Sequence, residues 1–309
     1  YGLYIFTSGG TINVYDGTFT VTGDKPVLKA DLDLGSYPNA VAEINISGGT
    51  FVGGIDMAKN ENVHLNITGG TFSVDPNAYC ATGYTATKNE SGQWVVSPKE
   101  GMEADTSVSG NTASAEVGGT FSGNEDLGQD NVGASNGTLS IDATVTEGDT
   151  AAITKTEVSI GNEALTSVSG ANSVNSVVLK TNVADLTVDK AAWNAITKNA
   201  DGAKVALTIE EKAGTGGAPL TYTVTATANG KDVYSADNAT GSIKISVKYE
   251  GTDLPKVYYV GPNGLEDMKA ELKDGILSWT AKHFSDYVVV SGEQKILVKE
   301  SDGSLEYYG

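Results

Sequence analysis

Two segments of the chain alternate between apolar and polar residues and then run into the same four-residue motif. Segments 42–46 and 63–67 place apolar residues at every second position, and the Gly-Gly-Thr-Phe that follows ends at Phe51 and Phe72, 21 residues apart. Alternation with a period of two predicts a half-buried β-strand. Paired glycines permit a sharp turn before the next extended piece. The pattern therefore predicts a repeated strand-turn-strand unit.

Gly-Thr-Phe occurs four times in a chain with six phenylalanines, at 17–19, 49–51, 70–72 and 119–121. A unit of about twenty residues is typical of one coil of a parallel β-solenoid (β-helix), whose stacked coils share a continuous core. We predict a short solenoid over residues 1–75, with the phenylalanines stacked inside and a longer excursion between Phe19 and Phe51. An antiparallel meander is the alternative.

The segment 44–98 also carries a longer sequence signature. It contains Phe72-Ser73-Val74-Asp75-Pro76, then Tyr79 and Gly83-Tyr84, and it resembles the Gly-Gly-Thr-Phe modules in large surface proteins of gut Firmicutes. The resemblance implies that this motif closes the repeat array and that a hairpin follows, with strands at 84–87 and 93–96. Cys80 departs from the small aliphatic residue expected there. The first predicted domain is 1–98.

After residue 106 the pattern changes to many short strands separated by tight turns. Polar residues 99–106 predict a linker. Strands are predicted at 137–146, 176–181, 185–188 and 203–210, and Asn229-Gly230 predicts a hairpin turn. One short helix is predicted from Lys190 to Asn199, because Asp189 is a good N-cap and Gly202 follows the end. We predict an all-β chain with a β-sandwich at 107–291 and the truncated start of a further segment at 292–309.

The second half resembles the β-sandwich that accompanies S-layer-homology repeats in Firmicutes surface proteins. The resemblance rests on the strand-helix-strand of 186–209, the alternating segment 243–249, Val257-Tyr258-Tyr259-Val260, and His283-Phe284-Ser285 followed by 287–289. Residues 107–140 match poorly, so the start of this domain is not defined by the resemblance. A location on the bacterial cell surface is what the resemblance implies.

The charge balance excludes one class of partner. The 309 residues carry 39 acidic and 20 basic side chains, a net charge of −19, and every basic side chain is a lysine. Such a chain repels phosphate backbones and lacks arginine, the usual bidentate reader of guanine. We therefore expect no nucleic-acid partner. No window has the roughly 18 consecutive apolar residues of a membrane span. Acidity and abundant glycine favour an extracellular protein.

His283-Phe284-Ser285 is the one motif that could carry covalent chemistry. It resembles the self-cleavage signature of ZU5-type and nucleoporin autoproteolytic domains. The resemblance implies that the Ser285 hydroxyl attacks the Phe284 carbonyl while His283 accepts the hydroxyl proton. The bacterial sandwiches carry the same tripeptide as a structural turn. We therefore expect a structural role and an intact chain, and we assign no other catalytic residue.

The remaining reactive side chains predict neither a metal nor a cofactor. Cys80 has no cysteine partner for a disulfide and is predicted to be a small buried hydrophobe. His64 is predicted to face solvent or a neighbouring coil, and no recognised zinc spacing joins the two histidines to Cys80. The acidic loops 124–131 and 31–33 lack the regular ligand spacing of an EF-hand, so solvated loops are favoured over Ca²⁺ sites.

These observations predict a non-enzymatic segment of a bacterial cell-surface protein, an adhesin or stalk whose partners are host or microbial surface glycans or proteins. One alternative is a carbohydrate-binding module that uses the sandwich tyrosines; another is an autoprocessing ZU5-like domain. A polysaccharide lyase built on the solenoid is disfavoured, because lyases need a long groove with clustered carboxylates and a basic group to stabilise charge. The sequence does not identify the ligand.

Overall fold

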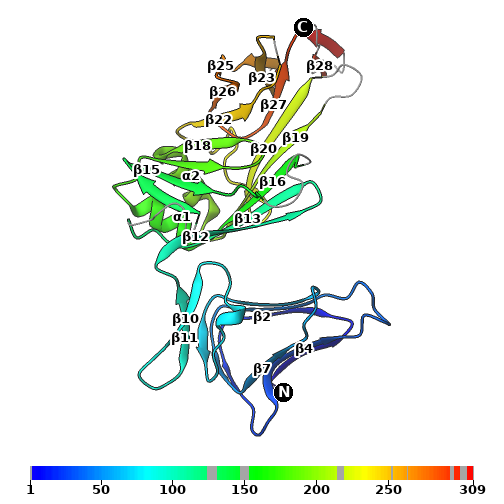
Figure 1. Cartoon of the computed structure of the whole chain (residues 1–309), viewed down its shortest axis with the longest axis vertical. Coiled ribbons are helices and arrows are strands. Elements are labelled where there is room, and N and C mark those ends of the chain that lie inside the picture. The colour runs from blue at the N-terminus through cyan, green and yellow to red at the C-terminus, as the bar shows by residue number, and fades with distance from the viewer. Residues whose placement is uncertain are drawn as a thin grey trace. The chain divides into compact units, whose positions relative to one another are not determined.

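The computed structural model is mostly β and divides into two compact units, Tyr1–Glu100 and Gly101–Gly309 (Figure 1). The structure describes residues 2–123, 131–146, 153–213, 219–251, 253–262, 264–292, 296–299 and 305–308. The predicted linker at 99–106 is wrong in its extent. Residues Gly101–Ser109 form strand β12, in which Met102 and Ala104 are buried. Met102 and Ala104 alternate with more exposed residues, as in a half-buried strand, so this segment pairs in a sheet instead of forming a linker.

The first unit contains three ladders of parallel strands, and each turn of the chain adds one strand to every ladder. The ladders are β1 (Leu3–Thr7), β4 (Pro26–Leu32) and β7 (Gly54–Met57); β2 (Gly10–Val14), β5 (Ala42–Ile46) and β8 (Val63–Ile67); and β3 (Thr18–Thr20), β6 (Thr50–Val52) and β9 (Gly70–Phe72). All six pairings are parallel. We call β1–β3, β4–β6 and β7–β9 the first, second and third turns.

The apolar positions of successive turns lie in register. Ile44 pairs with Ile12 on one side and Leu65 on the other, and Ile44 is fully buried. The rings of Phe19 and Phe51 are stacked with centroids 5.1 Å apart, and those of Phe51 and Phe72 with centroids 4.9 Å apart. The predicted phenylalanine stack is therefore present for three of the four motifs.

The fourth motif belongs to the second unit. Gly119 and Thr120 end strand β13 (Thr112–Thr120), and Phe121 packs against the core of that unit instead of the phenylalanine stack. The tripeptide alone does not distinguish the two settings. Phe121 is also preceded by a double glycine and an alternating strand, so the local pattern does not separate it from Phe51 and Phe72. What differs is the pairing, because β13 pairs with β12 and β16 and not with the strands of the phenylalanine stack.

A hairpin covers one end of the phenylalanine stack. Strands β10 (Tyr84–Lys88) and β11 (Trp94–Pro98) pair with each other, and β11 pairs antiparallel with β9, which places Trp94 opposite Phe72. The short 3₁₀ helix η1 (Asn77–Tyr79) precedes the hairpin. The Asn77 side chain accepts from Ala86 N at 2.8 Å and donates to Ala86 O at 3.1 Å, which fastens η1 to β10.

The second unit contains two large sheets with a shared apolar core. The first runs β12-β13-β16-β19-β20-β27-β23-β24, with β21 attached to β20, and the second runs β14-β15-β17-β18-β22-β26-β25. Their bounds not yet given are β14 (Val132–Ser135), β15 (Thr138–Asp142), β16 (Lys155–Ile160), β17 (Ser176–Lys180), β18 (Asp185–Asp189), β19 (Val205–Lys212), β20 (Leu220–Ala228), β21 (Lys231–Asp232), β22 (Ile243–Lys248), β23 (Lys256–Gly261), β24 (Gly264–Asp267), β25 (Glu271–Lys273), β26 (Ile276–Ala281) and β27 (Asp286–Val290). Most neighbours are antiparallel, whereas β13/β16 and β15/β17 are parallel.

Two α-helices occur in the described part of this unit, where one was predicted. The predicted helix is α2 (Lys190–Ala200), and Asp189 caps it by accepting from Ala192 N at 2.8 Å. The additional helix, α1 (Asn162–Gly170), begins after Gly161 without a side-chain cap. Its Thr, Ser, Val and Gly residues have low helix propensity, so packing of Ala164, Leu165 and Val168 in the core must stabilise it.

Most predicted strands of the second unit lie within two or three residues of their observed bounds. The turn at Asn229-Gly230 is present, with φ values of 49° and 72°, but the returning strand β21 is only two residues long. Residues 292–309, predicted as the start of a further segment, include a hairpin of β28 (Ile296–Lys299) and β29 (Leu305–Tyr308).

Candidate functional site

The His283-Phe284-Ser285 motif lies in the turn between β26 and β27. Backbone hydrogen bonds hold both sides of the Phe284–Ser285 peptide: Phe284 N donates to Tyr234 O in the bend after β21 at 3.0 Å, and Ser285 O accepts from Val224 N of β20 at 3.0 Å. The Phe284 side chain is 5% exposed and packs edge-on against the Tyr234 ring, with centroids 5.2 Å apart. The motif is therefore integrated into the core.

The His283 ring contacts the carbonyl that a self-cleavage reaction would attack. Its Nδ1 lies 3.1 Å from Phe284 O. In the tautomer with hydrogen on Nδ1, the ring donates to this oxygen and cannot accept the Ser285 proton through the same nitrogen. A general base must reach the hydroxyl that it deprotonates. This contact therefore serves to hold the turn in place, and the Nε2 atom is left as the only nitrogen available to act as a base in that tautomer.

Aromatic side chains enclose the same turn. The Tyr287 hydroxyl donates to His283 O at 2.5 Å, and the Tyr259 ring meets the His283 ring edge-on at 4.8 Å between centroids. Tyr287 is 1% exposed, and burial, followed by the nearby Tyr259, raises the pKa of its hydroxyl. A neutral, hydrogen-bonded Tyr287 therefore anchors the turn across the neutral pH range.

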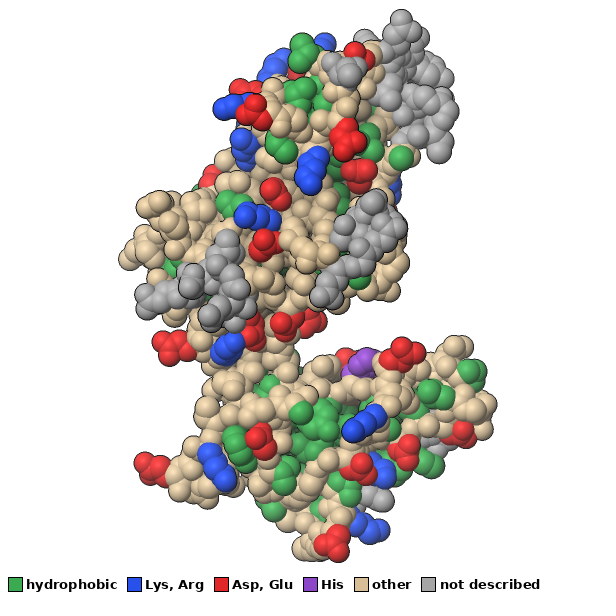
Figure 2. Space-filling view, viewed as in Figure 1, with side chains coloured by type: hydrophobic (Ala, Val, Ile, Leu, Met, Phe, Trp, Pro, Cys, Tyr) green, Lys and Arg blue, Asp and Glu red, His purple; other side chains and the backbone are tan. Residues whose placement is uncertain are grey.

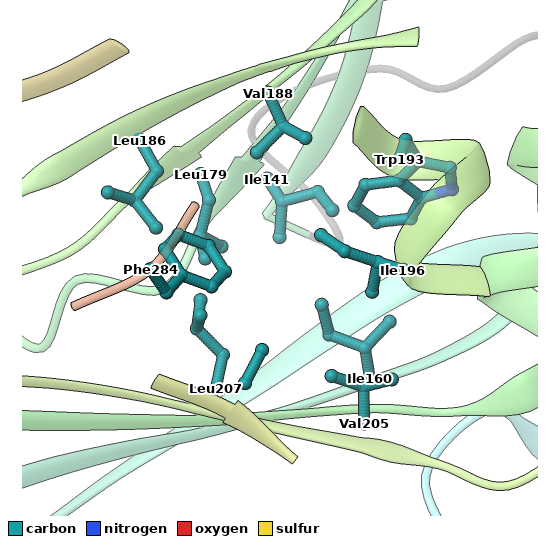
Figure 3. A pocket seen from close by; sticks show the side chains of 11 residues that line it. Ile141, Ile160, Leu179, Leu186, Val188, Trp193, Ile196, Val205, Leu207 and Phe284 are labelled. Carbon is teal, nitrogen blue, oxygen red and sulfur yellow. The ribbon is translucent and has the colours of Figure 1, made fainter. Parts of the chain in front are cut away.

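A small apolar cavity of about 20 Å³ lies next to Phe284. Figure 3 shows Phe284 and Trp193 on opposite sides of it, with Leu186 and Ile196 among the other side chains that border it. All its lining residues are apolar. A volume near that of one water molecule, without polar partners, leaves no room for a substrate. The cavity is a packing gap in the core of the second unit.

The first unit presents rows of polar side chains on the outer face of the β2-β5-β8 ladder. Asn66 Nδ2 donates to Asn45 Oδ1 at 3.0 Å, and Asn45 Nδ2 donates to Asn13 Oδ1 at 3.0 Å. Register places Thr11, Glu43 and His64 in a second row. Sequence reasoning missed this asparagine ladder, although each alternating strand has Asn at the same offset from its apolar residues.

His64 is placed as predicted, whereas Cys80 is less buried than predicted. His64 is exposed on the outer face of β8. Cys80 is half-buried, forms a β-bridge with Ile67 and packs against the core of the first unit. Burial, and then the charge of Asp75, raises the pKa of the Cys80 thiol. A protonated thiol is a weak nucleophile, which agrees with a packing role.

Within the described ranges, no three His, Cys, Asp or Glu side chains converge on a position that could hold a metal ion. Asp33 instead closes a local turn by accepting from Ser36 N at 3.1 Å, and hydrogen bonds from Ser36 hold the pKa of the Asp33 carboxyl below its ordinary value. Asp31 pairs in register with Phe6. Residues 124–130 lie outside the described residues, while Asn131 donates to Ala104 O at 3.2 Å.

Comparison with known proteins adds no assignment. No family model, curated protein or solved structure matches this chain. Among the described residues, no helix combines the length and apolar character that a membrane crossing requires.

Surface chemistry differs between the two units. Exposed aromatic side chains in the described chain are Phe6, Tyr15 and Tyr37, all in the first unit. In the second unit Tyr222, Tyr234, Tyr287, Trp193 and Trp279 are each at most 3% exposed. Figure 2 shows acidic and basic side chains interspersed over the faces in view. The first unit is therefore the one that exposes aromatic side chains with which a ligand could make contact.

Proposed function

We propose that this chain is a non-enzymatic segment of a bacterial cell-surface protein, an extracellular adhesin or stalk that presents a binding surface. In this proposal the first unit is a short parallel β-solenoid closed by the β10–β11 hairpin, and the second is a β-sandwich with two helices. The in-register pairing of Phe19, Phe51 and Phe72 is the observation that carries the proposal. Such stacking builds a rigid support whose outward side chains recur at the strand spacing.

The distribution of aromatic side chains favours the first unit as the contact surface. Phe6 is 60% exposed and Tyr15 is 76% exposed. Rigid aromatic side chains add contact area to an interface at a low cost in conformational entropy. The ligand class in this proposal is a surface glycan or protein, and the acidic chain disfavours a polyanionic ligand.

Two alternatives are weaker on specific grounds. A carbohydrate-binding module on the sandwich would need exposed aromatic rings, whereas the tyrosines and tryptophans named above are buried there. Partly buried Tyr249 and Tyr259 also pack against the core. An autoprocessing domain would need a base at the Ser285 hydroxyl, whereas His283 Nδ1 contacts the Phe284 carbonyl and leaves only Nε2 for that role.

The experiment is a binding screen of the whole chain against arrayed microbial and host glycans and purified host surface proteins. We expect selective binding that is lost in a Phe6→Ser/Tyr15→Ser variant and retained in Leu254→Ser, the matched control at an 86% exposed apolar residue of the second unit. Conversion of any arrayed glycan into a shorter product would contradict the non-enzymatic proposal. Binding lost only in Leu254→Ser would contradict the assignment of the surface.

A further inference from the structure

The two ends of the phenylalanine stack are covered to different extents. Phe72 is 1% exposed beneath strand β11, and Phe51, between two turns, is fully buried. Phe19, in the first turn, is only partly buried. The same holds for Leu3 and Ile12, whose register partners Leu28 and Ile44 in the second turn are fully buried.

The first turn forms the edge of all three ladders. Strands β1, β2 and β3 are end strands in the described sheets, and each has its only sheet neighbour in the second turn. Their sequences, LYIFT, GTINV and TFT, contain neither a charged residue nor proline. Proteins protect exposed edges with charges, proline or bulges, because an unprotected edge recruits another strand. Other end strands of the described sheets, among them β7, β12, β24 and β25, carry acidic side chains, whereas β8, β10 and β14 do not.

The asparagine ladder points in the same direction. Each asparagine donates its Nδ2 hydrogen to the Oδ1 of the preceding turn, from Asn66 to Asn45 and from Asn45 to Asn13. The Nδ2 group of Asn13 has the same place in its turn as the Nδ2 groups that Asn45 and Asn66 use to donate to the turn before them. A further turn would supply the acceptor if it carried Asn or Asp at this register.

We infer that the edge formed by β1, β2 and β3 is a docking surface for one further turn of the same repeat pattern. Its occupant is a polypeptide coil with apolar residues at the registers of Leu3 and Ile12, a side-chain acceptor at that of Asn13 and an aromatic ring at that of Phe19. The two turn-to-turn interfaces already present in the first unit have this chemistry. The inference rests on the coil stack proposed above.

Asp16 constrains the path of the occupant. It stands where the later turns have Gly48 and Gly69, and a Cβ at Gly48 would lie 2.2 Å from Tyr15 O of the preceding turn. A coil that docks on the first turn must therefore pass farther from the stack at this corner. The Asp16 carboxylate accepts from Gly17 N at 2.7 Å, which holds the corner in its present shape.

The test appends a copy of residues 21–52 directly before the chain. Leu3 and Ile55 both pair with Leu28. The copy ends at Val52, three residues before Leu3, which is the same spacing that separates Val52 from Ile55 in the chain. The added turn therefore enters the first turn in the native register. We expect amide hydrogen exchange in β1–β3 to slow to the rates of β4–β6. The matched control is the same extension with Ile44→Ser, Ile46→Ser and Phe51→Ser in the copy alone, which should leave exchange in β1–β3 unchanged.

Four outcomes would overturn the inference. Exchange in β1–β3 that is unchanged by the extension, or slowed equally by the control, would show that the edge does not recognise a coil. A dimer of the unmodified chain that Ile12→Lys abolishes would make a second copy the occupant instead. If the extended chain does not fold, a separate peptide of residues 21–52 is added to the unmodified chain, and absence of protection in β1–β3 then overturns the inference.

The same data separate this inference from the proposed function. Fast exchange of β4–β6 in the unmodified chain would reject the coil stack, and with it the proposed support. Slow exchange of β4–β6 together with an undocked extension would reject the docking surface alone. Either result is read from one peptide map, because each turn gives its own fragments.

Discussion

The rings of Phe51 and Phe72 lie 4.9 Å apart with their planes inclined by 10°, although 21 residues separate them in the chain. Both side chains are almost fully buried, and both belong to the apolar core of the first unit. The strands that carry them pair in parallel. The stack is therefore a structural device in which one short motif aligns the backbone of successive turns.

Removing a ring from the middle of the stack should be more costly than removing one from its end. We expect Phe51→Ala to lower the free energy of unfolding of the first unit by about 3–5 kcal/mol, the usual range for a buried phenylalanine. Phe19→Ala should cost less, because Phe19 is partly exposed. Chemical denaturation followed by hydrogen exchange reports the two units separately. Equal losses for both variants would contradict the ordered stack.

Asp189 should contribute more to the stability of the second unit than a surface carboxylate usually does. It caps α2 through Ala192 N and also accepts from the Ser242 backbone and hydroxyl, both at 2.8 Å. We expect Asp189→Ala to cost about 2 kcal/mol, the upper end for loss of an N-cap. Asp237→Ala, at an exposed carboxylate of the same unit, is the matched control and should be close to neutral in thermal unfolding.

Alkaline pH should destabilise the second unit in a defined window. Burial, followed by the charge of Asp189, raises the pKa of Tyr234 to about 12, and burial also raises the pKa of Tyr222 and Tyr287. A raised folded-state pKa means that the folded protein retains its proton while the unfolded chain loses it. Stability is therefore full below about pH 10 and falls as the pH rises toward 12.

Denaturation at a series of pH values tests this dependence. Tyr234→Phe should reduce the loss of stability between pH 10 and 12 without abolishing it, since it removes one of the three tyrosines whose pKa is raised in the folded state. Tyr15→Phe, at a highly exposed tyrosine of the first unit, is the control and should leave the slope for the second unit unchanged. A stability that rises over this window would contradict the assigned direction of the pKa shifts.

The peptide after Phe284 should remain uncut. His283 Nδ1 contacts the Phe284 carbonyl, and the neighbouring backbone groups are held by Tyr234 and Val224. Intact-mass measurement of freshly purified chain should give one species, identical in behaviour to Ser285→Ala. Two fragments that meet at the Phe284–Ser285 bond and disappear in Ser285→Ala would make the motif autoproteolytic.

The repeats can be predicted from the sequence because each one carries the same local pattern, an alternating strand followed by Gly-Gly-Thr-Phe. Alternation before the double glycine placed the strands that carry Ile44 and Ile46, and Asp189 located the start of α2. Tertiary packing decided the elements that were missed. Helix α1 lacks a side-chain cap, and Lys190 Nζ binds its last carbonyls at Val168 and Ala171, a contact that no local pattern indicates.

The candidate site was predicted less completely than the fold. The tripeptide at 283–285 is visible in the sequence, but its neighbours come from distant segments, Tyr259 from strand β23 and Tyr234 from the bend after β21, and their placement depends on the tertiary fold. The asparagine ladder corresponds in the sequence to a repeated offset, with Asn45 and Asn66 each one residue before the last apolar residue of its strand. Its meaning follows only from the parallel register of β2, β5 and β8.

Cross-linking between neighbouring turns tests the central claim of register most directly. In a Cys80→Ser background, Asn45→Cys/Asn66→Cys should form a disulfide on mild oxidation, because these residues are register partners and parallel strands lie about 4.8 Å apart, within the Cα separation of a disulfide. Asn45→Cys/Leu65→Cys should not, since Leu65 faces the core. Intact-mass analysis should show the loss of two hydrogens in the first variant alone. The same loss in both variants, or only in the second, would contradict a stack with phenylalanine inside and asparagine outside.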